Sequence, residues 1–167
     1  MMGKASVSIV MGSDSDLEIM QEASKALTEF GIASEIQVLS AHRSPQLVTQ
    51  FCSELKQRGI KVVIAGAGGA AHLAGVIAAH TTVPVIGVPI NSSALNGLDS
   101  LLATVQMPSG IPVATVAIGK PGAINAGILA AQILAVSSSD IESKLVKHKE
   151  KLLNSVVEKN SKLQKNR

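Results

Sequence analysis

Aromatic residues and cysteine are nearly absent from this sequence. Its 167 residues include no Trp, no Tyr, only two Phe and a single Cys, Cys52. The RNA-binding modules that stack bases on rows of aromatic side chains are therefore excluded. A disulfide-stabilised scaffold is also excluded, because Cys52 has no partner in the chain. Since Cys52 lies on the apolar face of a predicted helix, we interpret it as a core residue and not as a nucleophile.

Charged residues are also scarce, and the basic excess is confined to one end of the chain. Asp, Glu, Lys and Arg make up 16% of the residues, against about 25% in an average globular domain. Residues 1–139 contain seven basic and eight acidic side chains, whereas residues 140–167 contain eight basic and four acidic ones. A short basic helix at the C-terminus explains the net charge of +3, so we expect no nucleic-acid partner.

Long hydrophobic runs are missing, although the middle of the chain is almost uncharged. Asp99 is the only Asp, Glu, Lys or Arg between Val62 and Gly119. Prolines interrupt this stretch, and no apolar run reaches the roughly 18 residues that a membrane-spanning helix needs. The N-terminus does not have the pattern of a secretory signal peptide. We expect a cytoplasmic protein without membrane association, whose uncharged middle is covered by helices on both faces of a sheet or by neighbouring subunits.

Short β-branched runs alternate with helical patterns over most of the chain. This alternation favours a three-layer αβα fold of the α/β class with a mostly parallel five-stranded sheet, flavodoxin-like or Rossmann-like. Gly31 and Gly59 stand where helices of this fold should end, and Ser44-Pro45 where one should begin. The predicted strands cover Val7–Met11, Glu35–Leu39, Val62–Ala65, Val83–Val88 and Pro112–Ile118, and the predicted helices cover 17–30, 44–58, an Ala-rich segment ending at His80, a segment after the fourth strand, and Ala123–Val136.

The last residues form a separate amphipathic segment. Ser139-Asp140-Ile141-Glu142 has the capping-box pattern of a helix start, and we predict a terminal helix that frays after about Glu158. Its apolar residues are spaced four or seven apart, at Ile141, Leu145, Leu152 and Val156. The chain is thus organised as a single α/β domain over residues 1–137 and a C-terminal helical extension over residues 138–167, which we expect to pack on a neighbouring subunit.

Polar residues follow three of the predicted strands, at the edge where parallel α/β sheets bind ligands. The first group, Gly12-Ser13-Asp14-Ser15-Asp16, precedes the first helix. Gly12 would permit a tight turn. The hydroxyls of Ser13 and Ser15, together with the free N–H groups at a helix start, suit a phosphate and sugar site. Ser and Asp are also the commonest helix caps, so a purely structural role stays open.

The second group, Ser40-Ala41-His42-Arg43-Ser44-Pro45, lies between the second strand and the second helix. Arg43 can bind a phosphate through two hydrogen bonds. His42 can transfer a proton near neutral pH. A single loop with these residues would indicate little by itself, but its position beside the first loop favours a shared site.

The third group, Gly66-Ala67-Gly68-Gly69-Ala70-Ala71-His72, formally matches the dinucleotide-binding pattern G-x-G-x-x-A. The acid expected about 20 residues later is missing, since residues 84–98 contain no Asp or Glu, and this argues against NAD binding. The glycines would instead let backbone N–H groups approach a small anion such as a carboxylate. His72 either lines that site or is a satisfied histidine at a helix start.

The remaining candidates for chemistry are weaker. The four His and one Cys show no metal-ligand spacing, so no metal site is expected. We interpret His80, near a predicted helix end, as structural, and His148, in the charged C-terminal segment, as solvated.

Taken together, the three loops resemble the PurE family, the 5-(carboxyamino)imidazole ribonucleotide mutases of purine biosynthesis. The resemblance covers residues 6–137. The matching stretches are VMGSDSD (10–16), SAHRSP (40–45), IAGAGGAAHLAG (64–75), PVIGVPI (84–90), LDSLLATVQMPSGIPVATVAIG (98–119) and GAINAGILAAQIL (122–134). The chain is similar to the mutase class, which carries SAHR and GGAAHLPG, and differs from the class that carboxylates aminoimidazole ribonucleotide directly with carbon dioxide, which has Lys in place of Arg43. Ala74 departs from the mutase motif, which usually has Pro there.

The resemblance implies a role for each matching residue. His42 would be the general acid and base. The 5′-phosphate and neighbouring groups would be held by Ser13, Ser15, Ser40 and Arg43, and the ribose hydroxyls by Asp16. The imidazole and carboxylate pocket would be lined by Gly68, Gly69, Ala70, His72 and Leu73. The resemblance also implies a homo-octamer with sites at subunit contacts and no cofactor. Two alternatives stay open, namely a direct carboxylase and a ribonucleotide-binding module without turnover.

Overall fold

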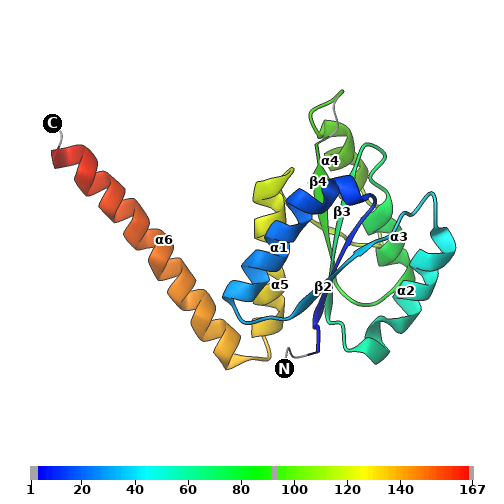
Figure 1. The fold of residues 1–167 in the computed structure, drawn as a ribbon, viewed down its shortest axis with the longest axis horizontal. Helices are drawn as coiled ribbons and strands as arrows, with labels where there is room; N and C mark the ends of the chain where they lie inside the picture. The colour runs from blue at the N-terminus through cyan, green and yellow to red at the C-terminus, as the bar shows by residue number, and fades with distance from the viewer. Residues whose placement is uncertain (1–3, 92–93, 166–167) are drawn as a thin grey trace.

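Five parallel strands form the centre of the structure, a computed structural model that describes residues 4–91 and 94–165 (Figure 1). Their spatial order is β2-β1-β3-β4-β5, and each neighbouring pair is parallel. This is the strand order of the flavodoxin-like fold, so the predicted fold class is confirmed. The strands are β1 (Val7–Met11), β2 (Ser34–Val38), β3 (Val62–Gly68), β4 (Val85–Ile90) and β5 (Ala114–Thr115).

Helices cover both faces of the sheet (Figure 1). They are α1 (Leu17–Glu29), α2 (Pro45–Arg58), α3 (Leu73–His80), α4 (Leu98–Val105) and α5 (Lys120–Ala135), with one turn of 3-10 helix, η1 (Asp14–Asp16), before α1. Successive strand residues point to opposite faces: Ile9 of β1 is buried in a cluster with α1 and α5, whereas Val10 is buried in a cluster with α2 and α3. α4 shares the face of α3, because a Cβ added at Gly87 would meet Thr104 of α4 and Ala74 of α3.

The predicted helix signals and the core position of Cys52 are confirmed. Pro45 is the first residue of α2, and Gly59 follows its end with a φ of 80°. Gly31 lies just after α1 with a φ of 74°. Cys52 is buried on α2, where its Sγ lies 4.0 Å from the carbonyl oxygen of Ile77. Burial raises the pKa of the Cys52 thiol to about 11, so the thiol stays protonated and unreactive at neutral pH.

The fifth strand is much shorter than the predicted strand over Pro112–Ile118. Only Ala114 and Thr115 pair with β4. Pro112 has no N–H to donate to a ladder. Beyond Thr115 two further backbone bonds to β4 form, from the N–H of Val116 to Gly87 O and from that of Gly119 to Pro89 O, but the chain no longer runs as a strand. β3, in contrast, continues three residues past the predicted end at Ala65, and this extension positions the third loop.

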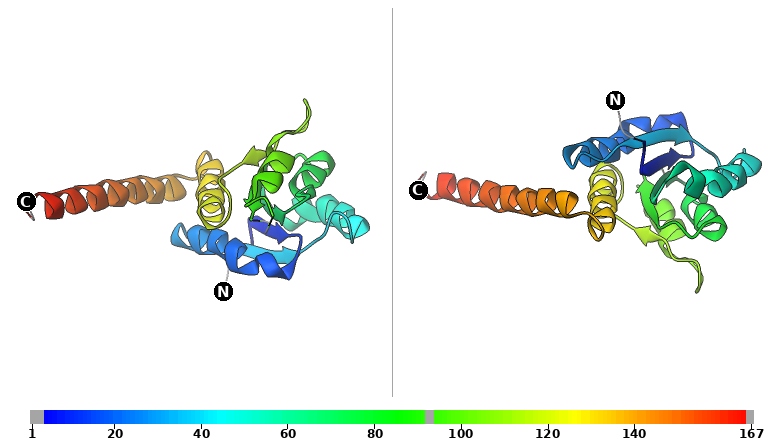
Figure 2. Two further views of the ribbon diagram at one scale, coloured as in Figure 1. Left: turned by 90° about the horizontal axis from the view of Figure 1, so that it is seen from above. Right: turned by 90° about the horizontal axis from the view of Figure 1, so that it is seen from below.

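The C-terminal helix α6 (Ser139–Lys165) is longer than predicted and begins at a different cap. The hydroxyl of Ser138, not of Ser139, accepts a hydrogen bond from the N–H of Ile141, at 3.5 Å. The expectation that the helix frays after Glu158 is wrong, because the helix continues to Lys165. It projects from the α/β domain as a single long rod (Figures 1 and 2). Within the described part of the chain, no helix is both long and apolar enough to span a membrane.

The first turns of α6 pack on the domain of their own chain. Ile141 and Leu145 contact the core cluster that contains Phe30. Lys144 Nζ donates to the carbonyl oxygen of Phe30 at 3.2 Å, and the ring of His148 meets that of Phe30 edge to face with centroids 5.5 Å apart. The interpretation of His148 as a solvated residue is therefore wrong. Docking on a neighbouring subunit therefore stays a prediction only for the rest of α6. The exposed apolar side chains of α6 are Val146, Leu152, Leu153, Val156, Val157 and Leu163.

Candidate functional site

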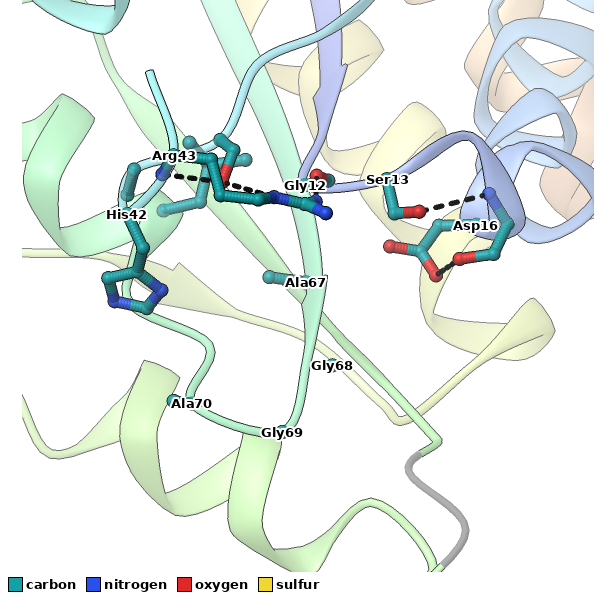
Figure 3. Close-up of a pocket in the computed structure, with 13 residues that line it drawn as sticks. Gly12, Ser13, Asp16, His42, Arg43, Ala67, Gly68, Gly69 and Ala70 are labelled. Carbon is teal, nitrogen blue, oxygen red and sulfur yellow. Dashed lines mark hydrogen bonds between the residues drawn. The ribbon is translucent and has the colours of Figure 1, made fainter. Parts of the chain in front are cut away.

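A cavity of about 500 Å³ lies at the carboxyl ends of β1, β2 and β3, where the three loops meet (Figure 3). Of the eleven residues singled out from the sequence, ten line it, and His72 does not. The lining residues are Gly12, Ser13, Ser15, Asp16, Ser40, Ala41, His42, Arg43, Ala67, Gly68, Gly69, Ala70 and Leu73. Gly12, Ala41 and Ala67 were not assigned a role in the site, although they belong to the same three motifs.

The first loop presents its hydroxyls through local hydrogen bonds. Ser13 is the N-cap of η1, and its Oγ accepts from the N–H of Ser15 at 3.4 Å. The Ser15 hydroxyl donates to Asp16 Oδ1 at 3.2 Å. Capping and cavity lining are thus properties of the same side chains, so the two interpretations of this loop are compatible. Gly12 has no positive φ, and a Cβ added there would meet no atom within 4 Å, so its conformation does not require glycine.

Asp16 is the acidic side chain in the cavity wall. Removal of its carboxylate from solvent raises its pKa above the usual value, and repulsion from Asp14 adds to this effect, whereas the hydrogen bond from Ser15 opposes it. A partly desolvated carboxylate is a strong acceptor for neutral hydroxyl groups and repels an anion. The position of Asp16 therefore suits an uncharged, hydroxyl-bearing part of a ligand.

The second loop is closed on itself by Ser44. Its hydroxyl accepts from the N–H of Ser40 at 3.1 Å and donates to the Ser40 carbonyl at 3.0 Å. Ser44 occupies the N-cap position of α2, but its side chain makes no capping bond to the helix. Ser44 thus stands where the cap was predicted, but its hydroxyl does not bond to the helix. It instead holds the turn that carries His42 and Arg43.

Arg43 joins the second loop to the first. Its Nη2 donates to the carbonyl oxygen of Gly12 at 2.6 Å, and its Nε donates to Ser40 Oγ at 3.2 Å (Figure 3). A guanidinium has five N–H donors, so these two bonds leave others for a ligand in the cavity. Arg43 therefore brings a positive charge to a wall that also carries three serine hydroxyls, those of Ser13, Ser15 and Ser40.

The third loop lines the cavity with glycine and alanine residues, so that its backbone is accessible to a ligand. Gly68, at the end of β3, lies close to β4, because a Cβ added there would be 3.4 Å from the carbonyl oxygen of Ile90. Gly69 has a φ of 61°, which favours glycine. The N–H groups of Ala71 and His72 then turn back onto the carbonyls of Gly69 and Ala70, both at 2.9 Å. The backbone of this loop forms one side of the cavity.

His42 and His72 contact each other directly. His42 Nε2 and His72 Nδ1 are 2.9 Å apart, and the two rings are nearly perpendicular, at 88°. His72 stands at the N-cap position of α3 but makes no side-chain capping bond there. Of the two interpretations made from the sequence, the satisfied histidine at a helix start agrees with this position, because the ring has a hydrogen-bond partner in His42.

The other histidines take no part in the cavity. His80 lies in the last turn of α3, and its Nδ1 lies 2.8 Å from the carbonyl oxygen of Val76, which agrees with a structural role. Among the residues that the structure describes, no group of three or more His, Cys, Asp or Glu is arranged to hold a metal ion.

Ala74 fits the position where the mutase motif has Pro. It is the second residue of α3, directly after Leu73. The first N–H groups of a helix have no acceptor within it, so Pro is tolerated in the first turn and Ala fits equally well. The departure at Ala74 therefore does not alter the start of the helix.

Comparison with known proteins gives consistent matches over nearly the whole chain. The profile of the family described as AIR carboxylase matches residues 6–155. The N5-carboxyaminoimidazole ribonucleotide mutase of Bacillus subtilis is 54% identical over 157 residues, which are 94% of this chain and 97% of that protein. The mutase of the same name from Thermotoga maritima is 53% identical over 158 residues, 95% and 91% of the two chains.

Solved structures show the same similarity. The crystal structure of Treponema denticola PurE superposes with a TM-score of 0.86 at 29% sequence identity. The match covers 94% of this chain and 97% of that one. The similarity therefore extends over nearly the whole fold.

Proposed function

The chain belongs to the AIR carboxylase family, and we propose that it is an isomerase of purine biosynthesis. It converts 5-carboxyamino-1-(5-phosphoribosyl)imidazole to 5-amino-1-(5-phosphoribosyl)imidazole-4-carboxylate. The observation that carries this proposal is the cavity itself, in which an arginine, three serine hydroxyls, a partly desolvated carboxylate, a histidine and a glycine-rich backbone meet. The curated relatives at about 54% identity bear the name of this mutase.

The 5′-phosphate binds at Arg43 and the serines of the first two loops. Arg43 already lies between the two loops, through Gly12 O and Ser40 Oγ, so its remaining N–H donors face a group placed between them. The N-terminal end of η1 and α1 lies at the same wall, and a helix N-terminus attracts anions. Ser13 and Ser15 add hydroxyl donors there once their present bonds are exchanged.

The ribose binds at Asp16, and the imidazole with its carboxylate at the third loop. Asp16 accepts hydrogen bonds from the two ribose hydroxyls, because a desolvated carboxylate favours neutral donors over a phosphate. The backbone from Gly68 to Ala70 approaches the planar imidazole without side chains in the way. Leu73, only 2% exposed, closes this end of the cavity with an apolar surface.

The reaction moves one carboxylate within the substrate. The bond between the carboxylate carbon and the exocyclic nitrogen breaks once that nitrogen is protonated, and carbon dioxide is released. The freed aminoimidazole is nucleophilic at ring carbon 4 and captures the carbon dioxide there. Carbon 4 then loses its proton, so the nitrogen gains one proton, carbon 4 loses one, and no electrons are transferred to another molecule. Keeping carbon dioxide beside carbon 4 until it is captured is a proximity effect.

His42 is the general acid and base in both half-reactions. It protonates the nitrogen in the first half-reaction and removes the proton from carbon 4 in the second, so it ends in its starting state. The position of its ring in the cavity wall, across from Ser13, supports this role (Figure 3). Proton transfer by a positioned side chain is typically worth about 10²–10⁴ in rate.

The chain also acts as a homo-oligomer in the cytoplasm, with an octamer as the assembly that the family resemblance implies. Apolar side chains exposed along α4 support an assembly, because large apolar patches are uncommon on monomers. They are Leu98, Leu102 and Val105, which are 52%, 48% and 47% exposed. Light scattering of the purified chain checks this point, and a mass near the 17.2 kDa of one chain contradicts it.

The test of the function compares two possible substrates. The purified chain, with an enzyme-free control, is incubated with the carbamate substrate or with aminoimidazole ribonucleotide and bicarbonate, and the 4-carboxylate is followed by ultraviolet absorbance. We expect rapid product formation from the carbamate only. Product from aminoimidazole ribonucleotide and bicarbonate at an equal or higher rate indicates a direct carboxylase instead. Binding of the ribonucleotide without product from either mixture indicates a module without turnover.

A further inference from the structure

We infer that Ser100, a buried residue of α4, is a positioning residue for the glycine-rich wall of the cavity. The inference rests on the function proposed above, since it concerns the wall that receives the imidazole. Ser100 does not line the cavity itself. Its side chain is 0% exposed, and its Oγ donates to the carbonyl oxygen of Ile90 at 2.7 Å.

Ile90 is the last residue of β4 and lies beside the third loop. Its partner in the parallel register of β3 and β4 is Gly68. The two backbones are close, because a Cβ added at Gly68 would lie 3.4 Å from the Ile90 carbonyl oxygen, the nearest atom to it. The oxygen that accepts from Ser100 is therefore also the oxygen that Gly68 packs against, and a shift of this end of β4 would shift the wall.

The hydroxyl of Ser100 joins the end of β4 to the start of α4. It also donates to the carbonyl oxygen of Gly97, the N-cap residue of α4, at 2.9 Å. A hydroxyl has a single proton, so the two carbonyls share it. The bond to Ile90 is the shorter one, and Gly97 O accepts a further bond from the N–H of Leu101 at 2.9 Å. Loss of the hydroxyl should therefore weaken chiefly the link between α4 and the end of β4.

The glycine-rich wall depends on this backbone support because it has no large side chains to hold it. Gly68 and Gly69 have none, and Ala70 has a single methyl group. A buried carbonyl oxygen that loses its donor is costly, which favours its movement toward water or another donor. Displacement by about 1 Å of a group that positions a substrate can lower the rate about 10²-fold. Ser100 would thus act on the reaction through Ile90 and Gly68, without touching the substrate.

Thr104 provides a matched control on the same helix. It lies one turn after Ser100, is 2% exposed, and its Oγ1 donates to the carbonyl oxygen of Ser100 at 2.7 Å. Ser100→Ala and Thr104→Val each remove one buried hydroxyl, so both should lower Tm. Only Ser100→Ala removes a bond to the end of β4. We expect Ser100→Ala to lower kcat/KM by about tenfold or more, and Thr104→Val to keep it within about threefold of the unmodified chain.

Two ligands separate positioning of the wall from a general loss of structure. The product carries the imidazole and carboxylate that the wall receives, whereas ribose 5-phosphate has only the sugar and phosphate held by the first two loops. In Ser100→Ala, the Kd of the product should rise about tenfold or more in a calorimetric titration, and that of ribose 5-phosphate should stay within about threefold. An equal rise for both ligands overturns the inference, because it indicates a loss that is not confined to the wall.

A further variant keeps the test valid if Ser100→Ala does not fold. Ser100→Cys retains a weak donor at the same place, and its product Kd should rise less than that of Ser100→Ala but more than that of Thr104→Val. Equal kcat/KM in the Ser100 and Thr104 variants overturns the inference, as does an unchanged product Kd. If the unmodified chain has no mutase activity, the proposed function fails, and the product titrations still decide the role of Ser100.

Discussion

Gly66 of β3 tests whether the packing beneath the third loop is as tight as the structure shows. A Cβ added at Gly66 would overlap with Met20 Sδ and lie 2.9 Å from Met20 Cε and 3.0 Å from Ile90 Cδ1. Met20 and Ile90 are themselves buried, at 0% and 3% exposure, so neither side chain can move into solvent. Overpacking of this kind costs about 1–3 kcal/mol. For a chain of this length each kcal/mol lowers Tm by about 2–4 °C, so Gly66→Ala should lower Tm by roughly 2–12 °C.

The matched control is Gly12→Ala, at the end of the neighbouring strand β1. A Cβ added at Gly12 meets no atom within 4 Å, so this variant should keep its Tm or gain slightly, because Ala restricts the unfolded chain more than Gly does. Thermal unfolding followed by circular dichroism at a fixed protein concentration measures both changes. A Tm for Gly66→Ala equal to that of Gly12→Ala would refute the reasoning.

A double-mutant cycle identifies the side chain responsible. Met20→Ala removes the thioether that the new methyl group would strike, although it lowers stability by about 2–5 kcal/mol on its own. Gly66→Ala should therefore cost much less in the Met20→Ala background than in the unmodified chain, because the new methyl partly fills the vacated space. An identical cost in both backgrounds would show that Met20 is not the obstacle.

Three further predictions follow from the described residues. Because burial raises the pKa of Asp16, its ionised form lowers the stability of the fold at pH values above that pKa, and this cost disappears once the group is protonated at lower pH. Asp16→Asn should therefore match or exceed the unmodified chain in Tm near pH 7 and lose that advantage below about pH 4. The same variant should bind the ribonucleotide more weakly in a titration. Because the pKa of Cys52 is about 11, only about one thiol in a thousand is ionised at pH 8, and a thiol-specific chromogenic disulfide should react with the folded chain far more slowly than with the chain in guanidinium chloride; a rapid reaction in both contradicts the buried position. The double variant Leu153→Asp with Val157→Asp places charges on exposed residues of α6 and should reduce the mass found by light scattering, whereas the control Asn154→Asp should leave it unchanged. Equal masses for the double variant and the unmodified chain would mean that this face of α6 does not contact another subunit.

The sequence predicts the loops that form the cavity better than it predicts the contacts between them. Turn and cap residues mark the ends of β1, β2 and β3, and the alternation of strands and helices places these ends at one edge of the sheet. The bonds from Arg43 to Gly12 and from His42 to His72 span 31 and 30 residues. Such contacts depend on how the loops approach each other in space, and no local pattern encodes them.

Elements at the margins of the fold were also beyond local prediction. The β-branched residues near Val113 predict a longer strand, but β5 lies at the edge of the described sheet, and only Ala114 and Thr115 pair with β4 as a strand. Ser139 and Ser138 are both good caps by type, and the hydroxyl that bonds to Ile141 is that of Ser138. The identity of His72 as a partner of His42, and not as a lining residue, required the relative position of two loops.

The most direct test of the account is the comparison of binding and turnover in His42→Asn. The ribonucleotide contacts proposed for Arg43, Ser13 and Asp16 remain in this variant, so the melting temperature should rise on addition of product as it does in the unmodified chain. The rate of conversion of the carbamate substrate should fall by at least about 10²-fold, the lower end of what general acid/base catalysis supplies. Turnover within a few fold of the unmodified chain would contradict the central claim that the His42 imidazole moves the proton in this cavity.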